Sequence, residues 1–122
     1  MAHKPRILVI DDDESILEFI AGVLNDEGYQ ASTATNGEEG LEAAAQAPPD
    51  LILLDMRMPV MDGWQFAEAY HRRPGRRAPI IVITAARDAA SSAEQIGAQG
   101  YLAKPFDLED LLALVSKYVR PV

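Results

Sequence analysis

The chain has 122 residues, enough for one domain, and it is 48% apolar and 25% charged, as is ordinary for a folded protein. Its net charge of −8 disfavours direct binding to DNA or RNA, and the lack of cysteine excludes disulfides and thiolate-bound metals. The sequence shows neither a signal peptide nor an apolar stretch long enough to span a membrane, so we expect a cytoplasmic protein without membrane contact.

The first part of the chain predicts two strand–helix units. Residues 7–10 form a continuous apolar run, which is typical of a strand covered on both faces of a parallel sheet. Residues 29–35 are a weaker strand candidate. Asn36, with Glu39 three residues later, predicts the start of a second helix. The first helix, which ends before Gly28, carries apolar side chains at helical spacing: Ile16, Phe19, Ile20, Val23 and Leu24.

The middle of the chain repeats this pattern. Residues 51–54 and 80–83 are two further apolar runs that predict buried strands. Between them, Asp62 can cap a helix that extends to Tyr70, with Pro74 beyond its end.

The last part of the chain completes five strand–helix repeats. It predicts a short alanine-rich helix from about Asp88 to Ile96, a weaker strand at residues 100–103, and a final helix capped by Asp107. That helix carries one apolar stripe: Leu108, Leu111, Leu112, Val115, Tyr118 and Val119. Five repeats with right-handed crossovers predict an α/β doubly wound sheet, in which ligands bind at the carboxyl ends of the strands.

The residues at those carboxyl ends are the candidates for a functional site. They are Asp11 and Asp12 after the first strand, Asp55 after the third, Thr84 and Ala85 after the fourth, and Lys104 after the fifth.

Two carboxylates about 5 Å apart repel by roughly 3 kcal/mol at an effective dielectric constant near 20, so the site needs positive charge. Lys104 supplies part of it, and an oxygen-only donor set suits Mg²⁺, with Mn²⁺ as an alternative. A carboxylate such as Asp55 can attack phosphorus. We expect Asp13 and Glu14 mainly to cap the following helix and to interact favourably with the positive end of its dipole.

Four segments carry a resemblance to a known family: ILVIDDDE, PPDLILLDMRMPVMDG, PIIVITA and GAQGYLAKPF. Over residues 1–122 the chain resembles the receiver domain of two-component response regulators, including the single-domain receivers of chemotaxis. The resemblance implies a flavodoxin-like (βα)5 fold with a five-stranded parallel sheet in the order 2-1-3-4-5.

The resemblance also implies roles for the acidic residues. Asp55 is expected to be the phosphoacceptor. Asp12 is expected to bind the metal directly and Asp11 largely through water, with Asp55 and the backbone carbonyl of Arg57 as further ligands.

The remaining roles concern the phosphoryl group and its readout. Lys104, Thr84 and Ala85 are expected to bind the phosphoryl group, and Tyr101 to turn inward as Thr84 moves. The peptide bond between Lys104 and Pro105 is expected to be cis.

The implied phosphodonor is a sensor histidine kinase or a phosphotransfer protein. A downstream partner, or a second copy in a dimer, is expected on the surface formed by residues 87–95 and 103–117. The chain is not expected to be an enzyme beyond its own phosphorylation and dephosphorylation.

Three alternatives remain open at this point. A haloacid dehalogenase-type phosphatase also uses a strand-end aspartate with magnesium, but it has a second aspartate where this chain has Arg57. A flavodoxin-like electron carrier has a phosphate-binding first loop, whereas this loop is acidic. The third alternative is a receiver-like binding module that is not phosphorylated.

Overall fold

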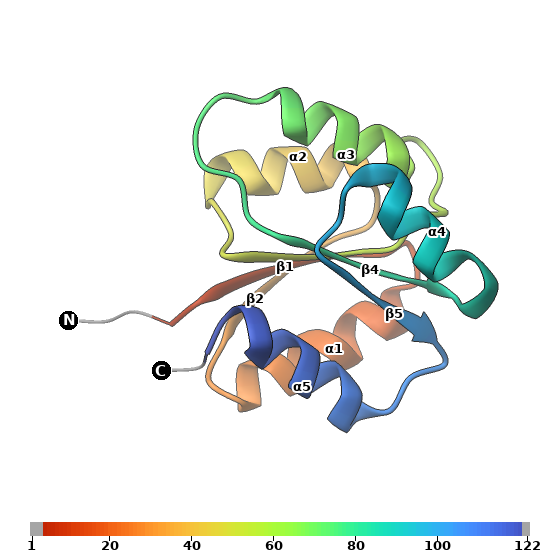
Figure 1. Cartoon of the computed structure of the whole chain (residues 1–122). Helices are drawn as coiled ribbons and strands as arrows, with labels where there is room; N and C mark the ends of the chain where they lie inside the picture. The colour runs from red at the N-terminus through yellow and green to blue at the C-terminus, as the bar shows by residue number, and fades with distance from the viewer. Residues whose placement is uncertain (1–3, 121–122) are drawn as a thin grey trace.

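A parallel sheet between two layers of helices forms the fold (Figure 1). The structure, a computed structural model, describes residues 4–120. The strand order is β2-β1-β3-β4-β5, as the resemblance implied. The strands are β1 (Arg6–Ile10), β2 (Gln30–Ala34), β3 (Leu51–Leu54), β4 (Ile80–Ala85) and β5 (Gly100–Lys104). The helices are α1 (Glu14–Asp26), α2 (Gly37–Gln46), α3 (Gly63–Arg72), α4 (Ala86–Ile96) and α5 (Leu108–Tyr118).

The sheet has an apolar core on each face because successive side chains of a strand point to opposite faces. On one face, where α2, α3 and α4 lie in Figure 1, Ile10, Leu54 and Val82 pack against Phe66 and Ala93. On the other face, covered by α1 and α5, Val9, Leu53 and Ile83 pack against Ile20 and Leu111. This double burial explains the unbroken apolar runs of the three central strands.

The helix starts partly differ from those predicted. Asp13 caps α1, and Asp62 forms a reciprocal capping box with Gln65 in α3. Helix α4 begins at Ala86 rather than at Asp88, because β4 runs straight into it, and its N-terminus has no side-chain cap. Asp107 occupies the N-cap position of α5 but accepts no capping hydrogen bond, so that part of the prediction was wrong.

Three other side chains also differ from the sequence-based expectation. Asn36 caps α2, but the Glu39 carboxylate accepts hydrogen bonds from Thr35 instead of closing the capping box. Phe19 of α1 is 55% exposed, whereas Leu17, which the predicted stripe omitted, is buried. The buried face of α1 is therefore rotated away from Phe19.

Within residues 4–120, no helix is long and apolar enough to cross a membrane.

Gly63, the first residue of α3, permits a close approach between this helix and the end of β3. A Cβ atom at this position would lie 2.6 Å from the Met56 sulfur, 2.7 Å from the Met56 Cα and 2.9 Å from the Asp55 carbonyl oxygen. Two of these three atoms belong to the backbone, which has little room to yield.

We predict that Gly63→Ala lowers the free energy of unfolding by roughly 1–3 kcal/mol, because the added methyl group overpacks the segment after Asp55. Urea denaturation measures this change. Gly22→Ala in α1 is the matched control, because nothing lies within 4 Å of the place that its methyl group would take. The control should stabilise the protein by up to about 1 kcal/mol. Equal effects of the two substitutions would contradict the prediction.

Candidate functional site

Strand register brings carboxylates from β1 and β3 together. Ile10 and Leu54 are partners in the ladder between these strands, so Asp11 and Asp55 leave the sheet side by side. The backbone N–H of Asp55 donates to the Ile10 carbonyl at 2.9 Å. Asp11, Asp12 and Asp55 each offer a carboxylate oxygen, and these oxygens lie within 4.8 Å of one another. Asp11 and Asp55 are buried, whereas Asp12 is exposed.

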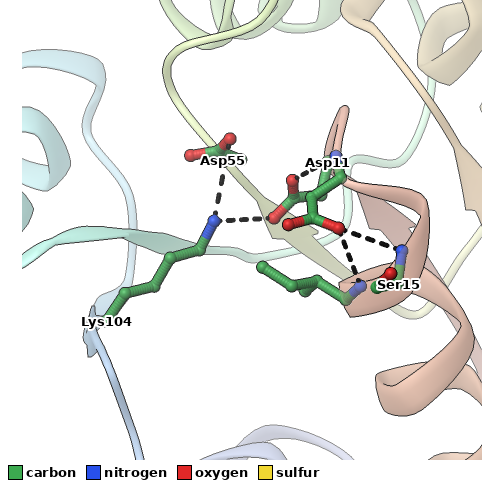
Figure 2. Close-up of polar contacts among 6 residues, drawn as sticks. Asp11, Ser15, Asp55 and Lys104 are labelled. Atoms are coloured by element: carbon green, nitrogen blue, oxygen red, sulfur yellow. Dashed lines mark hydrogen bonds and ion pairs between the residues drawn. The ribbon is translucent and has the colours of Figure 1, made fainter.

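Lys104, at the end of β5, reaches into this cluster (Figure 2). Its Nζ lies 2.9 Å from Oδ2 of Asp11 and 3.9 Å from Oδ2 of Asp55. The lysine therefore binds Asp11 directly and contacts Asp55 only at the outer limit of an ion pair. One ammonium group faces three carboxylates.

The three consecutive aspartates after β1 have different structural environments. Asp11 binds Lys104 and also accepts the backbone N–H of Asp13 at 2.9 Å. Asp13 accepts hydrogen bonds from the backbone N–H groups of Ser15 and Ile16, which confirms its predicted role as a helix cap. Asp12 forms no ion pair among residues 4–120, so its carboxylate is available to a cation.

Burial and neighbouring charge favour the protonated form of Asp55. Burial is the larger cause and the Asp11 carboxylate the second, and together they raise the pKa of Asp55 from 3.8 to about 6. Lys104 and the backbone N–H of Met56 oppose this shift without cancelling it. Excess negative charge therefore remains at the edge of the sheet, and an oxygen-only donor set of this kind fits a hard divalent cation such as Mg²⁺.

Arg57 follows this cluster in the loop after β3. Its side chain is 69% exposed and points toward α4, where its Nη2 lies 3.5 Å from Oδ2 of Asp88. Its guanidinium carbon also lies 5.7 Å from the centre of the Trp64 ring. The dehalogenase alternative needs an acid at this position, and the structure places an ion-paired arginine there.

Thr84 and Ala85 lie at the end of β4, next to β5. Thr84 is buried and is paired with Ala103, and Ala85 is paired with Lys104. Tyr101 is 51% exposed, so its side chain lies at the surface. The Lys104–Pro105 peptide bond is cis, as expected.

An apolar groove beside the carboxylates was not predicted from the sequence. It has a volume of about 560 Å³ and is lined by Ile16, Phe19, Ala85, Lys104, Pro105 and Phe106. The signal for it was available, because Phe19 is bulky and the Pro105-Phe106 pair directly follows Lys104. The helical spacing of Phe19 instead suggested a core residue.

The raised pKa of Asp55 predicts a pH-dependent stability in the absence of divalent metal. Below pH 3.8 the Asp55 carboxyl is protonated in both the folded and the unfolded protein, so it does not change the free energy of unfolding. As the pH rises to about 6, Asp55 ionises first in the unfolded state, so the folded state loses stability. Asp55→Asn should thus be more stable than wild type above pH 6, by at most about 3 kcal/mol and by less where solvent screens the charges, with the gain vanishing toward pH 3.8.

Thermal unfolding across this pH range measures the effect. Asp107→Asn is the control, because the exposed Asp107 carboxylate accepts no helix-capping hydrogen bond. A stability gain for Asp55→Asn that does not depend on pH would contradict the electrostatic explanation.

Comparisons with known proteins agree with this geometry. The family model for the response regulator receiver domain matches residues 7–116. The chain is 40% identical over 118 residues to the transcriptional regulatory protein PcoR of Escherichia coli, covering 94% of this chain and 51% of PcoR. It is 42% identical over 115 residues to the DNA-binding transcriptional regulator NtrC of E. coli K12, covering 93% of this chain and 24% of NtrC. The chain thus spans about half of one relative and about a quarter of the other.

The fold comparison points the same way. The structure of the chemotaxis response regulator CheY4 of Vibrio cholerae matches with a TM-score of 0.86 at 33% identity, covering 95% of this chain and 99% of that chain. Because the family model spans most of the sequence and the strand order and edge carboxylates agree with it, the chain belongs to the receiver domain family of two-component response regulators.

Proposed function

We propose that the chain is a single receiver domain that works as a signalling switch, in which Asp55 accepts a phosphoryl group. The donor is a sensor histidine kinase or a phosphotransfer protein. The observation that carries this proposal is the position of Asp55, buried at the sheet edge with two carboxylates within 4.8 Å and Lys104 at 3.9 Å. This arrangement provides a nucleophile, a cation site and a counter-charge.

Asp11, Asp12, Asp55 and the backbone carbonyl of Arg57 would hold Mg²⁺, or Mn²⁺ in its place. The oxygen-only donor set and the excess negative charge around Asp55 support this assignment. When bound, the cation reduces the charge repulsion between the carboxylates and the incoming phosphoryl oxygens.

The residues of the chain then perform the transfer. A carboxylate oxygen of Asp55 forms a bond to phosphorus while the bond between phosphorus and the donor's histidine nitrogen breaks, and the electron pair of that bond stays on the nitrogen. Lys104 turns from Asp11 toward the phosphoryl oxygens. The Thr84 hydroxyl and the backbone N–H of Ala85 donate hydrogen bonds to the same group.

The switch follows from the movement of Thr84. This buried hydroxyl gains a phosphoryl partner, and its displacement lets Tyr101 turn inward from its exposed position. The surface of α4, β5 and α5, at residues 87–95 and 103–117, changes shape and binds the downstream partner or a second copy. Beyond its own phosphorylation and dephosphorylation, the domain catalyses nothing.

The apolar groove beside the carboxylates is a suitable docking surface for the phosphodonor protein. Its lining includes Lys104, which also pairs with Asp11, and Phe19, which is exposed. A protein that covers Phe19 and Phe106 would bring its phosphohistidine to the carboxylate edge of the sheet.

We predict that acetyl phosphate with Mg²⁺ adds one phosphoryl group to wild type and none to Asp55→Asn, because the amide cannot displace acetate from phosphorus. Intact-protein mass spectrometry measures the addition. Asp107→Asn, which removes an exposed carboxylate outside the site, should be labelled like wild type. Undiminished labelling of Asp55→Asn would place the acceptor elsewhere.

Mg²⁺ should raise the melting temperature of wild type, because a ligand of the native state alone stabilises it by about 2.7 kcal/mol at a hundred times its dissociation constant. Asp12→Ala removes a proposed ligand and should abolish most of this rise. Glu18→Gln in α1 changes an exposed acid outside the cluster and should retain it. An equal rise in Asp12→Ala would exclude Asp12 as a ligand.

A further inference from the structure

Helix α4 packs on the body of the domain through small side chains, with Ile96 partly buried. It follows β4 directly and has no side-chain cap at its N-terminus. Its fully buried residues are small: Ala89, Ser92 and Ala93. Because small side chains bury little apolar area, polar contacts on the outer side of α4 add to what fixes its position on the sheet.

Those outer contacts come from one group of side chains on α3 and the loop after β3. The indole Nε1 of Trp64 donates a hydrogen bond to Oε1 of Gln95, in the last turn of α4, at 2.8 Å. The Arg57 guanidinium carbon lies 5.7 Å from the centre of the Trp64 ring. The same guanidinium pairs with Asp88, in the first turn of α4, at 3.5 Å. Both ends of α4 are therefore tied to one arginine–tryptophan pair.

We propose that Arg57, Trp64, Asp88 and Gln95 form a clamp that holds α4 in its resting position and opposes phosphorylation of Asp55. This inference rests on the proposed function of Asp55. The clamp belongs to the side chains of this chain and is separate from the backbone carbonyl of Arg57 that would bind the cation.

The position of the clamp in the sequence couples it to the site. Arg57 comes two residues after Asp55, and α4 begins two residues after Thr84. When Thr84 moves toward a phosphoryl group, the first turn of α4 is displaced, and Asp88 moves relative to Arg57. The contacts hold α4 in the position that the structure shows. In our proposal the displacement of α4 breaks them, so they favour the resting state over the phosphorylated one.

Thermodynamic linkage determines whether loss of the clamp strengthens or weakens binding of a phosphoryl group. An interaction present only in the resting state lowers the affinity for any ligand that binds the active state, by the same factor by which it favours the resting state. One exposed hydrogen bond with an adjacent cation–π contact corresponds to roughly a fivefold factor. Loss of the clamp should therefore strengthen binding of a phosphoryl analogue, whereas simple damage to the fold would weaken it.

The test compares Gln95→Leu and Trp64→Phe with wild type, using beryllium fluoride with Mg²⁺ as the phosphoryl analogue. Both variants lose the indole–amide hydrogen bond. Gln95→Leu keeps a side chain of similar size, and Trp64→Phe keeps an aromatic ring. Glu68→Gln is the matched control, because Glu68 forms a surface ion pair with Arg72 on α3 away from the clamp. Calorimetric titration measures the affinity, and hydrogen exchange of residues 86–96 measures the opening of α4.

We expect about fivefold tighter analogue binding and about fivefold faster exchange of α4 amides in both variants, and no change in Glu68→Gln. The double variant should gain no more than either single variant, because both remove the same hydrogen bond. Unchanged or weaker binding in both variants, with wild type binding normally, would overturn the clamp alone. No binding by wild type would overturn the clamp together with the proposed function of Asp55.

Discussion

Repulsion between carboxylates at one edge of a parallel sheet is the constraint on which this structure depends. The register that pairs Ile10 with Leu54 leaves Asp11 and Asp55 side by side and buried. Lys104 binds the first of them closely and the second only loosely, which leaves Asp55 with a raised pKa. Unbalanced negative charge remains at this edge of the folded protein, and a bound cation would reduce it. The proposed affinity for a divalent ion would thus follow from an electrostatic cost of folding.

The sequence predicted most of the fold because parallel sheets have a simple pattern. The three central strands are buried on both faces, so residues 7–10, 51–54 and 80–83 stand out as unbroken apolar runs. The start of α4 was misplaced because sequence reasoning relies on capping side chains, and Ala85 supplies none. Phe19 was assigned to the core because the predicted stripe covers a wide arc of the helix. The buried face, which Leu17 shares with Ile20 and Leu24, lies toward the opposite edge of that arc from Phe19.

The sequence predicted which residues of the candidate site lie together, but not which of them form ion pairs or hydrogen bonds. Strand ends must gather at one edge, so Asp11, Asp55 and Lys104 could be placed together without coordinates. That Lys104 prefers Asp11 depends on differences of about an ångström, which the sequence does not encode visibly. The contact between Trp64 and Gln95 joins residues 31 positions apart on two helices, and only their packing brings these polar groups within hydrogen-bond distance.

The position of Trp64 has a practical consequence. It is the only tryptophan in the sequence, and its ring contacts a guanidinium group on one side and a carboxamide acceptor at its N–H. Indole emission responds to nearby charge and to hydrogen bonding, so both contacts influence the fluorescence of the whole protein. The domain therefore carries its own optical reporter between the loop after Asp55 and α4, and fluorescence would report the proposed movement of α4 without any added label.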